Sequence, residues 1–157
     1  MSNAYHRHVT STVLEAPIEA VWAVVRDILK VVEIVIGDAA HGLRWTHGAS
    51  AEHVPARFQF KLADGSVAHE EVTARSETEH SIEYRANGVV LTMAEYAAAI
   101  RLQPVTLPAG QTFVTYERTF SFIPGVDHAD ALAMITGIMD NEMVALRQYF
   151  AKENADV

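Results

Sequence analysis

An arginine stands among aromatic side chains in the stretch VTYERTFSF, residues 114–122. Polar and apolar residues alternate there with a period of two, which predicts a half-buried β-strand. Arg118 falls on the apolar face of this strand, between Tyr116 and Phe120. Because a buried guanidinium without a partner is unfavourable, Arg118 needs a carboxylate, an anionic group of a ligand or a route to water. Three roles stay open: a rim arginine whose head reaches solvent, a structural ion pair, or a group that orients a ligand or takes part in catalysis.

The same alternation in residues 66–74 indicates a carboxylate for this arginine. Val72 and Ala74 are the apolar members of that stretch, and Glu70 shares their parity. Glu70 is therefore expected to point inward as well. The sharpest structural hypothesis is an ion pair between Glu70 and Arg118 across the interior of the protein. These two residues are the candidates for a catalytic role.

Three tyrosines fall on the expected inner faces of three separate strands: Tyr84, Tyr96 and Tyr116. A buried tyrosine hydroxyl needs a hydrogen-bond partner, and together with Glu70 such hydroxyls could polarise a ligand carbonyl or relay a proton. Cyclisation and dehydration both require such groups. The simpler interpretation is wall packing. Further residues expected to line or fill the interior, and so to contact a ligand, are Phe58, Phe60, Phe120, Met139 and Met143.

Composition excludes several classes of function. The formal charge of −8 and the pI near 5.4 argue against nucleic-acid binding, because the 12 Lys and Arg residues form no basic patch. The absence of cysteine excludes disulfides and thiolate metal sites. The eight histidines show no HExxH or other zinc spacing, and no GxSxG, GxGxxG or Walker motif occurs. We therefore expect no metal and no cofactor.

The length of the chain indicates one domain, residues 1–157. The expected location is the cytoplasm, which the absence of cysteine permits. The N-terminus has no basic stretch followed by an apolar run, so we expect no signal peptide. The longest aliphatic run, VVEIVIG at 31–37, is far shorter than the ~20 residues that span a bilayer. No transmembrane segment is expected.

The elements that must position these side chains follow from hydrophobic periodicity. A strand at 8–14 precedes a helix that opens near Pro17 and a second helical segment at about 27–36. Asp127 is the expected N-cap of a long helix that ends near residue 153 and carries an apolar stripe from Leu132 to Phe150. Between these helices, strands are expected at 41–46, 54–61, 66–74, 80–86, 91–103 and 111–123. This order predicts an α+β fold with a curved antiparallel sheet of six to seven strands around the C-terminal helix.

Several segments of the chain resemble, in order and spacing, the START-like (SRPBCC) superfamily and specifically its polyketide cyclase/dehydrase branch. The segments are LEAPIEAVWAVVRD at 14–27, ARFQFKLADG at 56–65, EEV at 70–72, IEYRA at 82–86, EYAAAIRLQP at 95–104 and VTYERTFSF at 114–122. The resemblance implies a helix-grip fold with a mostly apolar internal cavity for a small hydrophobic, lipid-like molecule. Because members range from carriers to cyclases and dehydratases, this fold does not by itself identify a function.

Three functions are consistent with these observations. The first is soluble binding of a small hydrophobic or aromatic ligand in a cavity between the sheet and the C-terminal helix. The second is a metal-independent enzyme of the polyketide cyclase/dehydratase kind that acts in the same cavity. The third is a protein-interaction module with a filled core and an exposed apolar patch. The expected partner is a small hydrophobic molecule, and a homodimer stays an open alternative.

Overall fold

A computed structural model of the chain describes residues 4–156. The chain forms β1 (His6–Leu14), α1 (Ile18–Val25), α2 (Ile28–Ile36), the 3-10 helix η1 (Gly37–Ala39), β2 (Ala40–Trp45), β3 (Ala56–Leu62), β4 (Val67–Ser76), β5 (Ser81–Ala86), β6 (Met93–Val105), β7 (Gln111–Phe122) and α3 (His128–Ala155). Residues 1–3, part of the segment in which no signal peptide is expected, lie outside the described residues.

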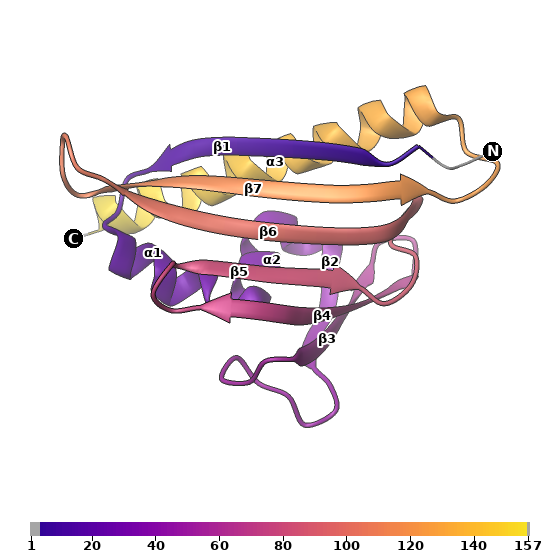
Figure 1. The fold of residues 1–157 in the computed structure, drawn as a ribbon, viewed down its shortest axis with the longest axis horizontal. Coiled ribbons are helices and arrows are strands. Elements are labelled where there is room, and N and C mark those ends of the chain that lie inside the picture. The colour runs from indigo at the N-terminus through magenta and orange to yellow at the C-terminus, as the bar shows by residue number, and fades with distance from the viewer. Residues whose placement is uncertain (1–3, 157) are drawn as a thin grey trace.

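The described residues form one seven-stranded sheet in the order β1-β7-β6-β5-β4-β3-β2, with every neighbouring pair antiparallel. Strands β3 and β2 turn behind the others, so the sheet curves around the helices (Figure 1). α3 runs behind β1 and β7 along the long axis, while α1 and α2 lie behind the other half of the sheet (Figure 1). The predicted α+β class, the antiparallel sheet and the helix-grip arrangement are confirmed.

The face of the sheet that meets the helices carries the core, as the alternating patterns require. On β6, for example, Tyr96, Ala98, Ile100 and Leu102 are all buried. The parity prediction for β4 is wrong at its end, because Ala74 is exposed. The register of β4 against β5 shifts between Val72 and Ala74, and such an irregularity moves the following side chains to the other face.

Helix α3 is fixed at its start by the predicted cap. The Asp127 carboxylate accepts a hydrogen bond of 2.9 Å from the backbone N–H of Asp130, which satisfies one free donor of the first turn. Further along, His8 Nε2 of β1 lies 2.9 Å from Asp140 Oδ1. These contacts help to hold α3 against the edge of the sheet, where it can reach the inward side chains of β7.

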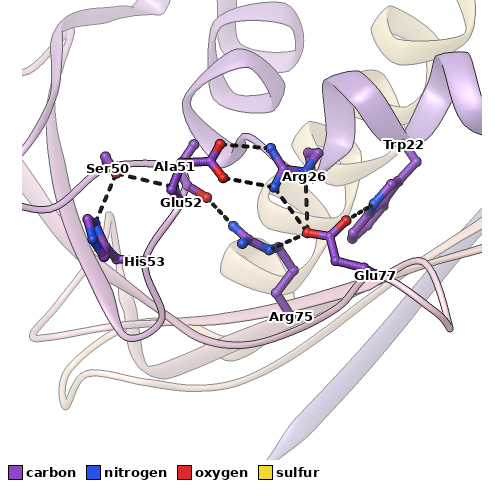
Figure 2. A network of polar contacts seen from close by, with 8 residues as sticks. All are labelled: Trp22, Arg26, Ser50, Ala51, Glu52, His53, Arg75 and Glu77. Carbon is purple, nitrogen blue, oxygen red and sulfur yellow. Dashed lines mark hydrogen bonds and ion pairs between the residues drawn. The ribbon is translucent and has the colours of Figure 1, made fainter.

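A polar network joins α1 to the β4–β5 turn and to the β2–β3 loop (Figure 2). Trp22 Nε1 donates to Glu77 Oε2 at 2.5 Å, and Arg26 contacts both Glu77 and Glu52 at 3.0–3.3 Å. Arg75 adds an ion pair of 3.0 Å to Glu77 and a hydrogen bond to the carbonyl of Ala51. Glu77, between β4 and β5, therefore joins α1 to this end of the sheet, and its two arginine partners, Arg26 and Arg75, reach on to the β2–β3 loop.

Glu77→Ala is expected to lower the free energy of unfolding by about 1 kcal/mol, because the buried indole N–H of Trp22 loses its acceptor. Glu52→Ala is the matched control, since it removes an exposed partner of Arg26 and keeps the Trp22–Glu77 bond. Urea denaturation followed by tryptophan fluorescence would measure both variants. Equal losses of unfolding free energy in the two variants would show that the Trp22–Glu77 hydrogen bond stabilises the fold no more than an exposed ion pair does.

In the described part of the chain, no helix is long and apolar enough to cross a membrane. The cytoplasmic location stays a prediction. Within residues 4–156, no group of three or more His, Asp or Glu side chains is arranged to hold a metal ion.

Candidate functional site

A cavity of about 470 Å³, open to solvent on the side of Asp64 and Asn141, lies between the helix-covered face of the sheet and helices α2 and α3. Its size is in the range of small-molecule sites in proteins. Five polar side chains of its wall are buried or nearly so: Glu70, Tyr84, Tyr96, Tyr116 and Glu142. The rest of the wall is mainly apolar and consists of Val32, Val35, Ile36, Ala39, Phe60, Leu62, Ala63, Val90, Leu91, Met93, Ile135, Ile138 and Met139, with Asp64 and Asn141 on the exposed surface.

The structure brings six of the ten predicted ligand-binding residues to this cavity: Phe60, Glu70, Tyr84, Tyr96, Tyr116 and Met139. The other four are buried but do not line it: Phe58, Arg118, Phe120 and Met143. Phe120, for example, packs instead against His6 and Phe122, with ring centroids 5.6 and 5.5 Å away. An inward parity thus places a residue in the interior, but its position along the element decides whether it meets the cavity.

Arg118 is fully buried, with 0% of its surface exposed. The rim alternative is therefore wrong. Its guanidinium carbon lies 3.3 Å from the centroid of the Tyr116 ring, and its Nη2 atom is ion-paired with Oε2 of Glu142 on α3. Burial acts to lower the pKa of Arg118, but the neighbouring tyrosines and the Glu142 carboxylate outweigh it and raise that pKa above its ordinary value. Arg118 is a permanent buried cation.

The predicted partner of Arg118 was wrong: its carboxylate comes from Glu142 and not from Glu70. β7 and β4 are separated by two strands, so their backbones lie about 14 Å apart along the sheet. Parity showed that both side chains point inward, and this is confirmed, but it carries no information on that distance. Helix α3 supplies the carboxylate that pairs with Arg118.

Glu70 faces the cavity with only 4% of its surface exposed. Within residues 4–156 it makes no hydrogen bond or ion pair. Burial raises the pKa of Glu70 to about 8, the nearby Glu142 charge adds to the rise, and Arg118 opposes it. Burial also raises the pKa of Glu142, but the charge and the hydrogen bond of Arg118 oppose that rise. Arg118 and Glu142 therefore form the ion pair of the site, while Glu70, with a pKa of about 8 and no paired cation, favours its protonated form at pH 7.

The three tyrosine hydroxyls meet beside these charges. The Tyr84 hydroxyl lies 3.3 Å from that of Tyr96 and is also hydrogen-bonded to that of Tyr116. Burial raises the pKa of all three phenols, most strongly for Tyr84 and Tyr96. They remain neutral at physiological pH and act as hydrogen-bond donors and acceptors rather than as bases.

Comparison with protein families identifies the family to which the chain belongs. A family model described as polyketide cyclase / dehydrase and lipid transport matches residues 6–151. The chain belongs to this family. The resemblance inferred from the sequence is thereby confirmed, and the family description is consistent with a fold that binds hydrophobic molecules. No curated protein matches the chain.

Solved structures with the fold of this polyketide cyclase / dehydrase family member come from several different organisms. The protein XoxI from Bacillus cereus superposes with a TM-score of 0.77 at 18% identity, covering 94% of this chain and 97% of its own. A protein from Nitrosospira multiformis gives 0.76 at 20% identity, covering 96% and 99%. A point mutant of norcoclaurine synthase from Thalictrum flavum, in complex with a transition-state analogue, gives 0.73 at 12% identity, covering 98% and 99%. At these identities the likeness shows the fold alone.

Glu142 is the polar group of this family member that sequence reasoning missed. It lies three residues after Met139 and four before Leu146, on the apolar stripe of α3. It is the helical counterpart of Arg118, a charged residue at a position where its element is otherwise apolar. The rule that singled out Arg118 would therefore have found Glu142 if applied to the helix.

Proposed function

We propose that this protein binds a small hydrophobic or aromatic molecule in the cavity between the sheet, α2 and α3. The observation that carries the proposal is the cavity of about 470 Å³ itself, whose apolar wall is interrupted by one cluster of buried polar groups. Apolar surface supplies affinity, and a few fixed polar groups orient the ligand. The interaction-module alternative requires a filled core, so the cavity counts against it.

Turnover of the bound molecule, in the manner of a cyclase or dehydratase, is a second candidate. It is favoured by the neutral carboxyl of Glu70 and the tyrosine hydroxyls in the same cavity, since an acid of this kind can protonate a ligand oxygen. Glu70→Gln would then abolish product formation and leave ligand binding in place. Product formed by this variant at the wild-type rate would refute the catalytic role of Glu70.

Met139→Trp is expected to weaken binding of the uncharged dye Nile red by about tenfold, because the larger ring fills part of the cavity. Met134→Trp is the matched control on the same helix, since Met134 is 50% exposed and does not line the cavity. Its affinity is expected to stay within about twofold of the wild type. Fluorescence titration measures both, and the cavity is not the binding site if the two variants behave alike.

A further inference from the structure

We infer that the cavity selects an uncharged ligand that carries a hydrogen-bond acceptor, such as a carbonyl oxygen, and rejects carboxylate ligands. This inference rests on the proposed function and deepens it. Two features of the cavity support it: the signs of the charges on the lining side chains, and the hydrogen-bond donors of the wall that have no acceptor in the protein.

The charges that line the cavity have one sign. Among the described lining residues there are three carboxyl groups, those of Asp64, Glu70 and Glu142, and no Lys, Arg or His. The nearest buried cation, Arg118, does not line the cavity and already pairs with Glu142. An anionic ligand would therefore enter a region of low dielectric that already holds a carboxylate, and no lining cation would pair with it.

A cationic ligand is less well matched than a neutral one. The Glu142 carboxylate is already compensated by Arg118, and Asp64 is exposed to solvent. Only Glu70 is left for an ammonium group, and its carboxyl would have to lose its proton in a buried setting. An uncharged ligand leaves the existing balance of one cation and one anion unchanged.

The wall offers donors that no protein group uses. Glu70 is unpartnered within residues 4–156 and, as a neutral acid, has one O–H to donate into the cavity. The three tyrosines have three hydroxyl hydrogens, and the two contacts of Tyr84 with Tyr96 and Tyr116 use at most two of them. At least one phenolic O–H is therefore free as well. Two unused donors beside an apolar wall match a ligand whose polar group is an acceptor.

A series built on one naphthalene ring tests the inference by displacement of Nile red from the wild-type protein. We expect 2-acetylnaphthalene to bind about fivefold more tightly than 2-ethylnaphthalene, which has no acceptor. We expect 2-naphthoate to bind at least about 100-fold more weakly than the ketone. A naphthoate affinity equal to that of the ketone would overturn the inference, as would tighter binding of 2-(aminomethyl)naphthalene than of the ketone.

Variants of Glu70 assign the preference to its donor. Glu70→Leu should bind the ketone and the hydrocarbon equally, whereas Glu70→Gln, which keeps a donor and almost the same shape, should retain the preference for the ketone. Glu71→Gln is the control, because Glu71 is next in the chain but pairs with Arg57 and Arg85 and does not line the cavity. Loss of the preference in Glu70→Gln, or its loss in Glu71→Gln, would contradict the role of Glu70.

The outcome with the wild-type protein separates the two proposals. If Nile red itself does not bind the wild type, the proposed function fails. If Nile red binds but the ligand series shows no selectivity, only the inferred preference for an uncharged acceptor fails.

Discussion

Replacing Arg118 with methionine is expected to lower the free energy of unfolding by about 3–5 kcal/mol. The guanidinium is completely buried and compensates the Glu142 carboxylate, which is itself largely buried. Methionine fills a similar length of the interior but leaves that carboxylate without a cation. The loss arises from the uncompensated buried charge rather than from the removal of favourable packing.

The double variant Arg118→Met, Glu142→Leu is expected to recover most of this loss, because no charge then stays uncompensated. Nε and Nη1 of Arg118 have no hydrogen-bond partner within residues 4–156, so removing the whole pair also removes two unsatisfied donors. Urea denaturation at pH 7 of the wild type, both single variants and the double variant completes the cycle. Additive losses in the double variant would show that the two residues do not act as a pair.

Glu70→Gln is expected to raise the free energy of unfolding at pH 8 by about 4 kcal/mol relative to the wild type. The carboxyl of Glu70 has a pKa of about 8 in the folded protein against an ordinary value of 4.5, chiefly because it is buried. A group with a raised folded pKa stabilises the fold fully below its unfolded pKa, and this contribution is lost as the pH rises through the folded value. The free energy of unfolding of the wild type should therefore fall between pH 5 and 8. The Glu70→Gln variant should lack this part of the pH dependence.

Urea denaturation at pH 5 and pH 8 measures the difference in unfolding free energy between Glu70→Gln and the wild type. This difference should be small at pH 5 and large at pH 8. Glu71→Gln is a control with the opposite sign, since hydrogen bonds from Arg57 hold the pKa of Glu71 below its ordinary value. That variant should be less stable than the wild type by nearly the same amount at pH 8 and pH 5, because the contribution of a group with a lowered folded pKa is lost only as the pH falls below its unfolded pKa of 4.5. A pH-independent effect of Glu70→Gln would show that Glu70 is already ionised in the folded protein.

The fold could be predicted from the sequence because polar and apolar residues alternate along most of its strands and its turns carry clear signals. The inward face of β7 and the Asp127 cap of α3 were both predicted and are both confirmed. The irregularity in β4 could not be predicted, since nothing in the local sequence distinguishes Ala74 from a residue in regular pairing. Local periodicity therefore predicted the elements well and their interruptions poorly.

The candidate site was predicted only in part, because a site depends on how elements are aligned as well as on which face they show. Glu70 and Arg118 were both placed inward, but three strand spacings lie between their strands. The offset of α3 along the sheet decides that Glu142 meets Arg118, and no periodicity within one element records that offset. For the same reason the sequence predicted a cavity but only two of the apolar side chains that line it, Phe60 and Met139.

The central claim, that a hydrophobic ligand occupies this cavity, is tested most directly by NMR of the protein carrying ¹³C-labelled methionine methyl groups. Met93 and Met139 line the cavity, whereas Met134 lies exposed on α3 and serves as an internal control. On titration with 2-acetylnaphthalene we predict shifts of the Met93 and Met139 methyl signals and an unchanged Met134 signal. Saturable shifts of Met134 with no change at Met93 and Met139 would contradict the account and place the ligand on the surface.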